Sequence, residues 1–371
     1  MKKVVFFVES MHCGGAERSL LSLLQNLDRN KYEIDLLVIN KGGAFEKFIP
    51  SNVNYKCLNL KFSFLGKIKF FFNRKRESDT HTAQVFWKTY SKQSPQYDKK
   101  YDIAIAWGQG FATYFTSTKI DAATKYAWIN TDYDKAGYQF DYDKALYRNF
   151  DKVVGVSDFV RDSMSKYIPA HKLLSIVDII DENDVIARAV EPEHFNFDIN
   201  VNNIVSVGRL AKLKAFDLAI ETAKHLEDNK VNFKWYIIGE GPERKNLEKS
   251  IADHNLQEVF ILLGHKDNPY PYIKACDIYV QTSSFEGLGR TIIEASLLNK
   301  PIVTTNFPTA YGLLENEKTG LIVEMEVNKI SNAIQKLILD ESFKFTLIEN
   351  LKKKKNLNKQ TTLDQVYALL D

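Results

Sequence analysis

Residues 4–39 read VVFFVESMHCGGAERSLLSLLQNLDRNKYEIDLLVI. The stretch begins with a short apolar run, turns at two glycines, continues with the leucine spacing of an amphipathic helix and ends in a second apolar run. Apolar runs that alternate with helices in this way are typical of parallel sheets built from βαβ units. Residues 204–239 repeat the pattern as IVSVGRLAKLKAFDLAIETAKHLEDNKVNFKWYIIG. One such unit therefore opens each half of the chain.

More apolar runs follow in both halves. DIAIAW, KYAWI and KVVGVS continue the first half, and VFILLG, DIYVQT and PIVTTN continue the second. We predict an α/β protein of two Rossmann-like, doubly wound domains that face each other across a cleft. The domains are expected at 1–180 and 181–354, with the C-terminal helix, 355–371, packed back on the first. The polar stretch 178–203 is expected to connect them.

Composition supports a globular chain with two cores. A chain of 371 residues is long for one core, and 44% hydrophobic and 12% aromatic residues are typical of a packed protein. Lys and Arg number 50 against 47 Asp and Glu, which leaves a net charge of +3. This balance argues against general nucleic-acid binding, which requires a strongly basic surface.

The cysteines and the N-terminus indicate a soluble, cytoplasmic protein. Cys13, Cys57 and Cys276 are odd in number and far apart, so they form neither a disulfide framework nor a metal-binding spacing. The start, MKKVVFFVES, has five consecutive apolar residues, fewer than a secretory signal needs. No run approaches the roughly 20 apolar residues of a membrane span.

Gly14 and Gly15 lie between the first expected strand and its helix. Backbone without side chains can approach a ligand closely there, and the following helix offers free N–H groups and the positive end of its dipole. The alternative is a tight turn that needs one positive φ angle.

Two cations follow the first strand of the second half. Arg209 comes directly after Gly208, and Lys214 follows five residues later, before the helix. Side chains at a strand's carboxyl end face the expected cleft, so this pair could hold a diphosphate. The alternative is that both are solvated surface residues.

Residues 284–296 read SFEGLGRTIIEAS and carry two carboxylates, Glu286 and Glu294. Thr291 with Glu294 has the spacing of a helix capping box, which is the structural interpretation of Glu294. Glu286 lies in the glycine-containing loop before the helix, where amides and Arg290 would attract negative charge. A carboxylate beside phosphate is unfavourable, so hydroxyl groups are the better partners for both. Phosphates flanked by hydroxyl-rich rings describe a nucleotide sugar.

In these motifs the sequence resembles the retaining glycosyltransferases of the GT-B class, in the large fourth family of bacterial surface-polysaccharide and lipopolysaccharide enzymes. The resemblance covers nearly the whole chain, and it implies that 1–180 is the acceptor domain and 181–354 the nucleotide-sugar donor domain. Its parts are GGAER at 14–18, VGRLAKLKAFD at 207–217, IIGEGPERKNLE at 237–248, LLGHKDNPYPYIKACDIYVQTS at 262–283 and FEGLGRTIIEA at 285–295.

The resemblance implies catalytic roles for Arg209, Lys214, Glu286 and Asn130, and donor binding by Glu294. Arg209 and Lys214 would neutralise the diphosphate as it leaves, and Glu286 would hydrogen-bond the transferred sugar. Glu294 would bind the ribose hydroxyls. Catalysis would be electrostatic and require no metal or other cofactor, with retention at the anomeric carbon. A covalent carboxylate intermediate is the alternative, but no residue is an evident nucleophile.

The resemblance also implies a donor-binding surface. Gly14 and Gly15 would approach the donor or the acceptor, and the turn at Gly264 would border the base. The amides from Leu288 through Gly289 to Arg290 would bind phosphate. UDP is the expected nucleotide because it is common among the family's donors.

The chain departs from the family pattern at three places. Asn130 stands where the family commonly has a His that contacts the transferred sugar, and Asn cannot carry a proton. His12 could compensate, although a single His beside a turn is more often incidental. Ala215 replaces a common Gly, and Asp178 lies where an Asn-containing turn is frequent.

Residues 61–76, KFSFLGKIKFFFNRKR, interleave basic and aromatic side chains. This pattern suits an anionic membrane surface, and the expected contacts are Lys67, Lys69, Phe71, Arg74 and Lys75. The alternative is a helix packed on the core with a solvated face.

The sequence thus predicts a transferase that moves a sugar from a nucleotide sugar to a glycan or lipid-linked glycan at the inner face of the cytoplasmic membrane. Two alternatives are a non-catalytic partner subunit, which Asn130 favours, and a GT-B sugar-nucleotide epimerase. An epimerase would release free UDP without an acceptor.

Overall fold

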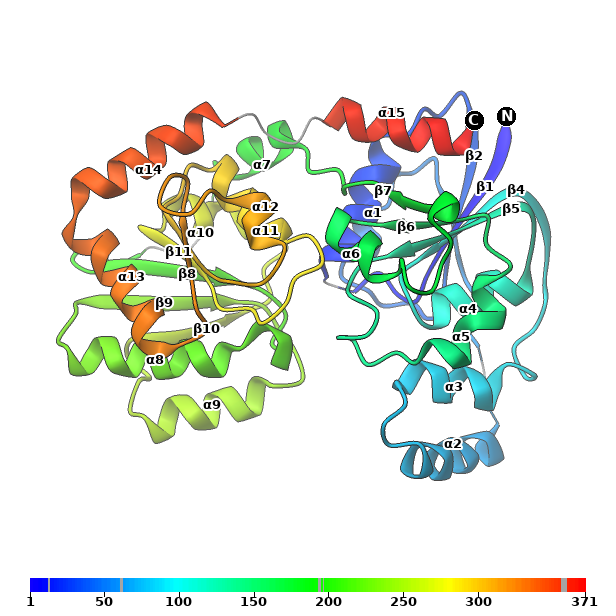
Figure 1. The fold of residues 1–371 in the computed structure, drawn as a ribbon, viewed down its shortest axis with the longest axis horizontal. Coiled ribbons are helices and arrows are strands. Elements are labelled where there is room, and N and C mark those ends of the chain that lie inside the picture. Colours follow the sequence, from blue (N-terminus) through cyan, green and yellow to red (C-terminus); the bar gives the residue numbers. More distant parts are fainter. Residues whose placement is uncertain (13, 61–62, 193–194, 196, 355–358) are drawn as a thin grey trace. The chain divides into compact units, whose positions relative to one another are not determined.

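The chain forms two compact units in the computed structural model: unit 1 is Met1–Ile179 with Asn358–Asp371, and unit 2 is Ile180–Leu357. The structure describes residues 1–12, 14–60, 63–192, 195, 197–354 and 359–371. Cys13, Lys61 and the first residues of the expected helix 355–371 lie outside this set. Figure 1 shows each unit as a sheet with helices on both faces.

Unit 1 is built on a seven-stranded parallel sheet in the order β3-β2-β1-β4-β5-β6-β7. Its strands are β1 (Lys2–Val8), β2 (Tyr32–Val38), β3 (Asn54–Cys57), β4 (Tyr97–Trp107), β5 (Ile120–Ile129), β6 (Lys152–Gly155) and β7 (Leu173–Ser175). The chain winds outward in both directions from β1 and β4, which is the doubly wound topology.

Seven α-helices and two short 3-10 helices complete the described part of unit 1. They are α1 (Gly15–Asn26), η1 (Glu46–Phe48), α2 (Phe64–Arg76), α3 (Thr82–Tyr90), α4 (Phe111–Lys119), α5 (Phe140–Tyr147), α6 (Asp158–Ser163), η2 (Ala170–Lys172) and α15 (Lys359–Leu370), with α7 in unit 2. Side chains alternate between the two faces along β1. Val5 and Phe7 pack with Phe111 of α4 on one face, whereas Phe6 packs on Trp107, whose indole N–H donates to the Ala16 carbonyl of α1.

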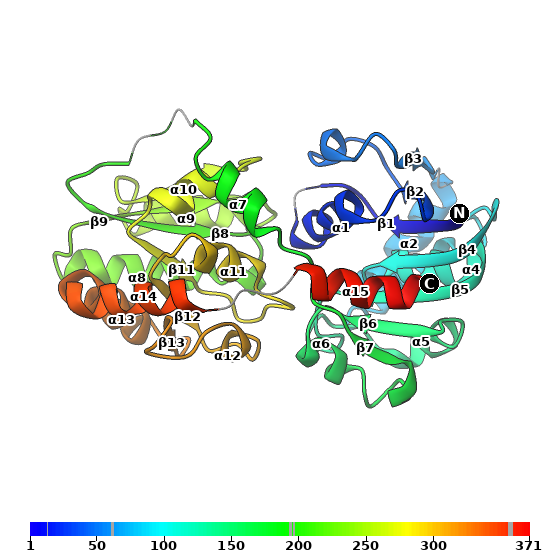
Figure 2. The same ribbon diagram turned by 90° about the horizontal axis from the view of Figure 1, so that it is seen from above.

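The C-terminal helix α15 belongs to unit 1. Tyr367 stacks on Tyr32 at the start of β2, with ring centroids 6.2 Å apart. The Lys2 ammonium donates to the Leu370 carbonyl, and the Tyr126 hydroxyl donates to the Leu369 carbonyl. The two chain ends therefore lie side by side (Figures 1 and 2).

Unit 2 has a six-stranded parallel sheet in the order β10-β9-β8-β11-β12-β13. The strands are β8 (Asn202–Val207), β9 (Phe233–Ile238), β10 (Phe260–Gly264), β11 (Ile278–Gln281), β12 (Ile302–Thr305) and β13 (Leu321–Val323). The helices are α7 (Glu182–Arg188), η3 (Lys212–Lys214), α8 (Phe216–Asp228), α9 (Arg244–Asp253), α10 (Tyr270–Ala275), α11 (Arg290–Leu297), α12 (Ala310–Leu313), α13 (Val327–Leu339) and α14 (Glu341–Lys353).

One hydrophobic core holds unit 2 together. Ile220 of α8, Ile334 of α13 and Trp235 of β9 are all fully buried in it. Helices α7, α10 and α11 contact one another, and α8 contacts both α9 and α13. The predicted α/β fold with two doubly wound sheets is confirmed. Helix α7 lies in the stretch 178–203, for which the sequence indicated only a polar connection.

No helix of the described residues combines the length and the apolar character that a bilayer crossing needs.

Candidate active site

The predicted donor residues lie at one edge of the sheet of unit 2. Arg209 follows β8, Gly239 follows β9, Gly264 ends β10 and Glu286 follows β11. These four strands are consecutive in the sheet and parallel, so their carboxyl ends meet. Ligands of open α/β sheets bind at this edge.

Gly239 allows the loops of this edge to pack closely. Its φ is +152°, and an added Cβ would lie 1.9 Å from the Gly208 carbonyl oxygen. Its amide donates to the Gly264 carbonyl at 2.9 Å. Any larger residue at 239 would push the loop that carries Arg209 away from the sheet.

Lys214 lies at the end of η3, and its aliphatic stem crosses Gly208. A Cβ on Gly208 would come within 3.1 Å of the Lys214 Cε, so the glycine makes room for the stem. The ammonium forms an ion pair with Glu286 Oε1 at 2.5 Å. Thr282 donates to the Lys214 carbonyl, and the Ser284 amide donates to the Leu213 carbonyl. The fold thus joins two predicted residues that are 72 positions apart.

Glu286 is held through one carboxylate oxygen. Oε1 accepts hydrogen bonds from Lys214, from Gln281 at 2.5 Å and from Ser283 at 2.6 Å. Within the described part of the chain, Oε2 takes part in no hydrogen bond, and the side chain is 13% exposed. One oxygen is fixed, and the other remains available to a donor hydroxyl of a ligand.

Arg209 is exposed and, among the described residues, makes no ion pair. Its position after β8 places a permanent cation at the same edge as Lys214. A planar guanidinium with free N–H groups suits a phosphate.

Glu294 and Arg290 form a buried pair inside α11. The Arg290 Nε lies 2.9 Å from Glu294 Oε1, and the two side chains are 9% and 3% exposed. The Tyr270 hydroxyl donates to the same oxygen at 3.0 Å. The capping-box interpretation of Glu294 is wrong, because α11 starts at Arg290, one residue before Thr291. Thr291 instead donates to Gln281 Oε1 at 3.2 Å.

Gly289 is the N-cap residue of α11 and has a φ of +78°, and a Cβ there would clash with Leu313. Leu288 before it is buried. A helix leaves its first N–H groups without intrahelical partners, so the amides that follow Gly289 can accept an anion. Gly264 also has a positive φ, +75°, and lies beside the ion pair of Glu240 with Arg244.

In unit 1, Gly14 and Gly15 lie at the start of α1. Neither has a positive φ, so the interpretation of this turn as one that needs a left-handed glycine is wrong. An added Cβ on Gly15 would meet nothing within 4 Å, which leaves open space above the helix N-terminus. His12 is exposed.

Asn130 follows β5, and its backbone N–H donates to Gln109 Oε1 at 3.0 Å. Its side-chain oxygen is buried and finds no hydrogen-bond partner within the described ranges. Buried polar atoms in native proteins are normally hydrogen-bonded, so an unpaired one at a strand's carboxyl end is a candidate ligand contact.

Sequence reasoning missed Glu9, at the end of β1. The residue as a whole is exposed, yet one carboxylate oxygen accepts the Phe111 amide of α4 at 3.0 Å. Burial of that carboxyl raises the pKa of Glu9, and the hydrogen bond opposes the shift. The N-cap residue of α4 is Gly110, which has no side chain, so Glu9 serves as its cap. A capping residue from another strand leaves no sequence signal.

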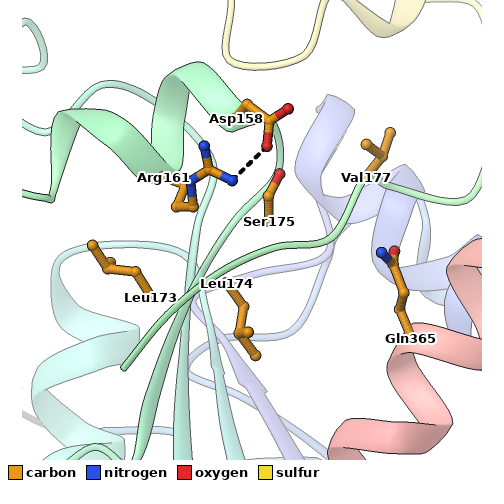
Figure 3. A pocket seen from close by; sticks show the side chains of 7 residues that line it. All are labelled: Asp158, Arg161, Leu173, Leu174, Ser175, Val177 and Gln365. Atoms are coloured by element: carbon orange, nitrogen blue, oxygen red, sulfur yellow. Dashed lines mark hydrogen bonds and ion pairs between the residues drawn. The ribbon is translucent and has the colours of Figure 1, made fainter. Parts of the chain in front are cut away.

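Two further cavities are lined by other residues. One, of about 410 Å³ in unit 1, contains the ion pair of Arg161 with Asp158 and reaches Gln365 of α15 (Figure 3). The other, of about 730 Å³ in unit 2, lies around Phe195, Asn202 and Glu341. Within the described ranges, no group of three or more His, Cys, Asp or Glu side chains could hold a metal ion.

Residues 188–358 match the family model described as Glycosyl transferases group 1. This segment, a little under half of the chain, resembles the group 1 glycosyltransferases. The match contains Arg209, Lys214, Glu286 and Glu294, so the family and the geometry indicate the same edge of unit 2.

Curated relatives extend the likeness beyond that segment. The chain is 26% identical to the N-acetylgalactosamine-N,N'-diacetylbacillosaminyl-diphospho-undecaprenol 4-alpha-N-acetylgalactosaminyltransferase of Campylobacter jejuni, over 93% of this chain and 92% of the relative. It is 27% identical to the poly(ribitol-phosphate) alpha-N-acetylglucosaminyltransferase of Staphylococcus aureus over 65% of this chain. That match spans 49% of the relative, about half its length.

Solved structures confirm the GT-B fold of this chain. Anabaena HepE in complex with UDP and glucose has a TM-score of 0.75 at 18% identity and covers 100% of this chain and 99% of its own. A mutant of S. aureus TarM in complex with fondaparinux, alpha-GlcNAc-glycerol and UDP has a TM-score of 0.69 at 15% identity and covers 100% of both chains.

Proposed function

We propose that the protein transfers a sugar from a UDP-sugar to a hydroxyl of a glycan or lipid-linked glycan in bacterial surface-polysaccharide synthesis. The pair of Lys214 and Glu286 carries the proposal, because it puts a cation suited to a diphosphate beside a free carboxylate oxygen suited to a sugar hydroxyl. The named substrates of the C. jejuni and S. aureus relatives support the acceptor class. The UDP complexes of HepE and TarM support the nucleotide.

The proposed reaction is electrostatic and needs no resident metal or cofactor. The acceptor oxygen bonds to the anomeric carbon, the bond from that carbon to the diphosphate breaks, and the acceptor proton passes to the departing diphosphate. Lys214 and Arg209 would neutralise the negative charge that develops on the leaving group. Glu286 would hold the transferred sugar, and Glu294 the ribose hydroxyls. Attack on the face that the diphosphate leaves would retain the anomeric configuration.

Peripheral attachment to the inner face of the cytoplasmic membrane is part of the proposal, through α2. Apart from Gly66, its residues are not buried, and Phe70 packs on Phe86 and Tyr90 of α3. Phe64, Leu65, Phe71 and Phe72 are between 56% and 77% exposed. Exposed apolar bulk on a soluble surface marks an interaction site, and the surrounding basic side chains favour anionic lipid.

The details of α2 assign its residues different roles. Lys67 and Lys69 are exposed, and the Lys75 ammonium lies 4.7 Å from the centroid of the exposed Phe71 ring. Arg74 donates to the carbonyls of Glu77, Ser78 and Thr80, so it closes the helix C-terminus and is a poorer candidate for lipid contact than predicted.

Isothermal calorimetry against UDP, GDP and ADP tests the donor site. We expect UDP to bind most tightly, and Glu294→Ala to weaken UDP binding because its carboxylate would no longer reach the ribose. Lys230→Ala, at an exposed site, is the matched control and should bind UDP like the wild type. Equal binding of all three nucleotides, or of none, would contradict the proposal.

A non-catalytic partner subunit is the second candidate, and Asn130 is the observation that favours it. Such a subunit would bind UDP but transfer no sugar to any acceptor. Incubation with a radiolabelled UDP-sugar and lipid-linked acceptors separates the two, since only the enzyme labels the acceptor.

A further inference from the structure

Strand β11 carries two polar side chains in the middle of the sheet of unit 2. It lies between β8 and β12, and all four of its residues are buried. Tyr279 is 0% and Gln281 4% exposed. A polar group buried without a partner is costly, so a central strand of an α/β sheet is normally apolar. The presence of Tyr279 and Gln281 in this buried strand therefore calls for a structural or functional explanation.

Gln281 connects Tyr279 to Glu286. Its side-chain oxygen accepts the Tyr279 hydroxyl at 2.7 Å and the Thr291 hydroxyl at 3.2 Å. Its side-chain nitrogen donates to Ser283 at 2.7 Å and to Glu286 Oε1 at 2.5 Å. Two hydroxyl donors on the oxygen and a carboxylate acceptor on the nitrogen determine which way the amide faces. A reversed amide would put its oxygen against the carboxylate.

The network fixes Glu286 independently of Lys214. Ser283, which is fully buried, also donates to Glu286 Oε1 at 2.6 Å. When Lys214 turns toward a diphosphate, Gln281 and Ser283 still hold Oε1. The free Oε2 then keeps one direction, and a carboxylate already oriented loses less entropy when it binds a hydroxyl.

We propose that Gln281, oriented by Tyr279, is a positioning residue that presents Glu286 Oε2 to a hydroxyl of the transferred sugar. The inference rests on the proposed function, in which Glu286 contacts that sugar. According to this proposal, the part of the donor's binding affinity that comes from the sugar depends on a buried chain of hydrogen bonds that begins inside the sheet.

A general role in core stability is the alternative, and the same sheet provides a control. Ser206 of β8 is 1% exposed, donates to the Val280 carbonyl at 2.6 Å and accepts the Trp235 indole N–H at 2.9 Å. Among the described residues, Ser206 forms no hydrogen bond with Glu286. Ser206→Ala therefore disturbs buried polar contacts in the adjacent strand without touching the proposed site.

The first experiment compares UDP with UDP-sugars by calorimetry on the full chain. The probes are UDP, UDP-glucose, UDP-galactose, UDP-N-acetylglucosamine and UDP-N-acetylgalactosamine. For the wild type we expect one UDP-sugar to bind more tightly than UDP. Gln281→Met, of similar volume, should reduce that preference by roughly tenfold or more and leave UDP affinity unchanged. Ser206→Ala should keep the preference.

A second variant tests the hydrogen bond itself. Gln281→Glu puts a carboxyl beside Glu286, so the two would share a proton. The protonated carboxyl can still donate to Glu286 Oε1 and accept from Tyr279. The preference for the UDP-sugar should then hold at low pH and fall as pH rises and the pair loses its proton. The other charged groups around the pair are Lys214, Arg290 and Glu294. Gln281→Met should show no such pH dependence.

The outcomes separate the two proposals. If the wild type binds neither UDP nor any UDP-sugar, the proposed function fails and this inference fails with it. If the wild type prefers a UDP-sugar and Gln281→Met retains the preference, the inference is overturned and the function stands. A wild type with equal affinity for UDP and all the UDP-sugars, or an equal loss in Ser206→Ala, also overturns it. Should Gln281→Met not fold by circular dichroism, Tyr279→Phe replaces it and should lower the same preference by a smaller factor.

Discussion

Lys214 and Glu286 satisfy each other's charge when no ligand is present. Their contact at 2.5 Å keeps a cation and a carboxylate, both only partly exposed, from being left unpaired. A diphosphate would offer Lys214 a stronger partner, and the network from Gln281 and Ser283 would keep Glu286 in place. At the scale of single residues, the contact between Lys214 and Glu286 is therefore one that a diphosphate could replace without displacing Glu286.

Lys214→Ala should lower kcat by on the order of a hundredfold to a thousandfold, because charge on the leaving diphosphate loses its nearest cation. The cost to folding should be small, about 1–2 kcal/mol, since Glu286 keeps two donors. Steady-state transfer assays and urea unfolding measure the two effects. Lys212→Ala, an exposed lysine in the same 3-10 helix, is the control and should retain activity. Near-normal turnover of Lys214→Ala would refute the diphosphate assignment.

Ala215 occupies a left-handed conformation, with φ and ψ both 47°, just before α8. For a residue with a Cβ this costs about 1–2 kcal/mol, and glycine adopts it without strain but loses more entropy on folding. Ala215→Gly should therefore raise the free energy of unfolding by about 0.5–1 kcal/mol. Ala219→Gly makes the same change inside α8 and should lower the free energy of unfolding by about 1 kcal/mol. Urea denaturation of both variants tests this, and destabilisation by Ala215→Gly would contradict it.

At the scale of elements, a strand with charged residues at one end is longer in the structure than the sequence predicted. DIAIAW predicts a strand that starts at Asp102, whereas β4 starts at Tyr97. Residues 97–101 read as polar, but the Lys99 ammonium lies 3.0 Å from the fully buried Asp35 of β2. Tyr101 also donates to Asp35 at 2.6 Å. A strand can be charged where a neighbouring strand supplies the partner, and a single segment does not show that partner.

Helix α2 should bind anionic vesicles through its basic residues. A lysine near such a surface contributes about 1 kcal/mol, so neutralising Lys67, Lys69 and Lys75 together to Gln should weaken partitioning by on the order of a hundredfold. Sedimentation with phosphatidylglycerol vesicles measures the effect. The control neutralises three exposed lysines of unit 2, Lys230, Lys245 and Lys249, with the same change in net charge. An equal loss of vesicle binding in both triple variants would show that net charge alone, and no specific contact of α2, causes the binding.

At the scale of the whole molecule, each unit has its own sheet and its own buried cluster. The predicted donor residues on the second sheet, from Arg209 to Glu294, all belong to unit 2. Donor recognition and folding of that unit should therefore be separable from unit 1.

A fragment of residues 180–354 should fold on its own, bind UDP and transfer no sugar, because it lacks the acceptor side proposed for unit 1. Calorimetric unfolding and UDP titration of the fragment test this. A matched fragment with Glu294→Ala should bind UDP more weakly and unfold at lower urea concentration, because Arg290 loses a buried ion-pair partner. A fragment without a cooperative unfolding transition would show that unit 2 depends on unit 1.

Much of the site was within reach of the sequence, because its parts follow strands. Arg209, Lys214 and Glu286 could be predicted from their places after apolar runs, since parallel strands end at one edge. Glu9 and Gln281 could not, because their partners lie on other strands or in loops and no local spacing records them. Thr291 and Glu294 show the opposite error. Their spacing matches a capping box, but in the structure Glu294 accepts a hydrogen bond from Tyr270 and Thr291 donates one to Gln281.

By itself, the sequence determined the α/β class, the alternation of strands and helices and the end of the sheet where the chemistry lies. These features follow from periodicity and from the position of glycines, which act within a few residues. Only the tertiary structure decided that Lys214 pairs with Glu286, that Glu294 is buried against Tyr270 and that α2 keeps its apolar face exposed. Those results depend on which side chains meet across the fold. The sequence pattern alone does not favour one long-range contact over another, whereas burial and the need to pair polar groups do.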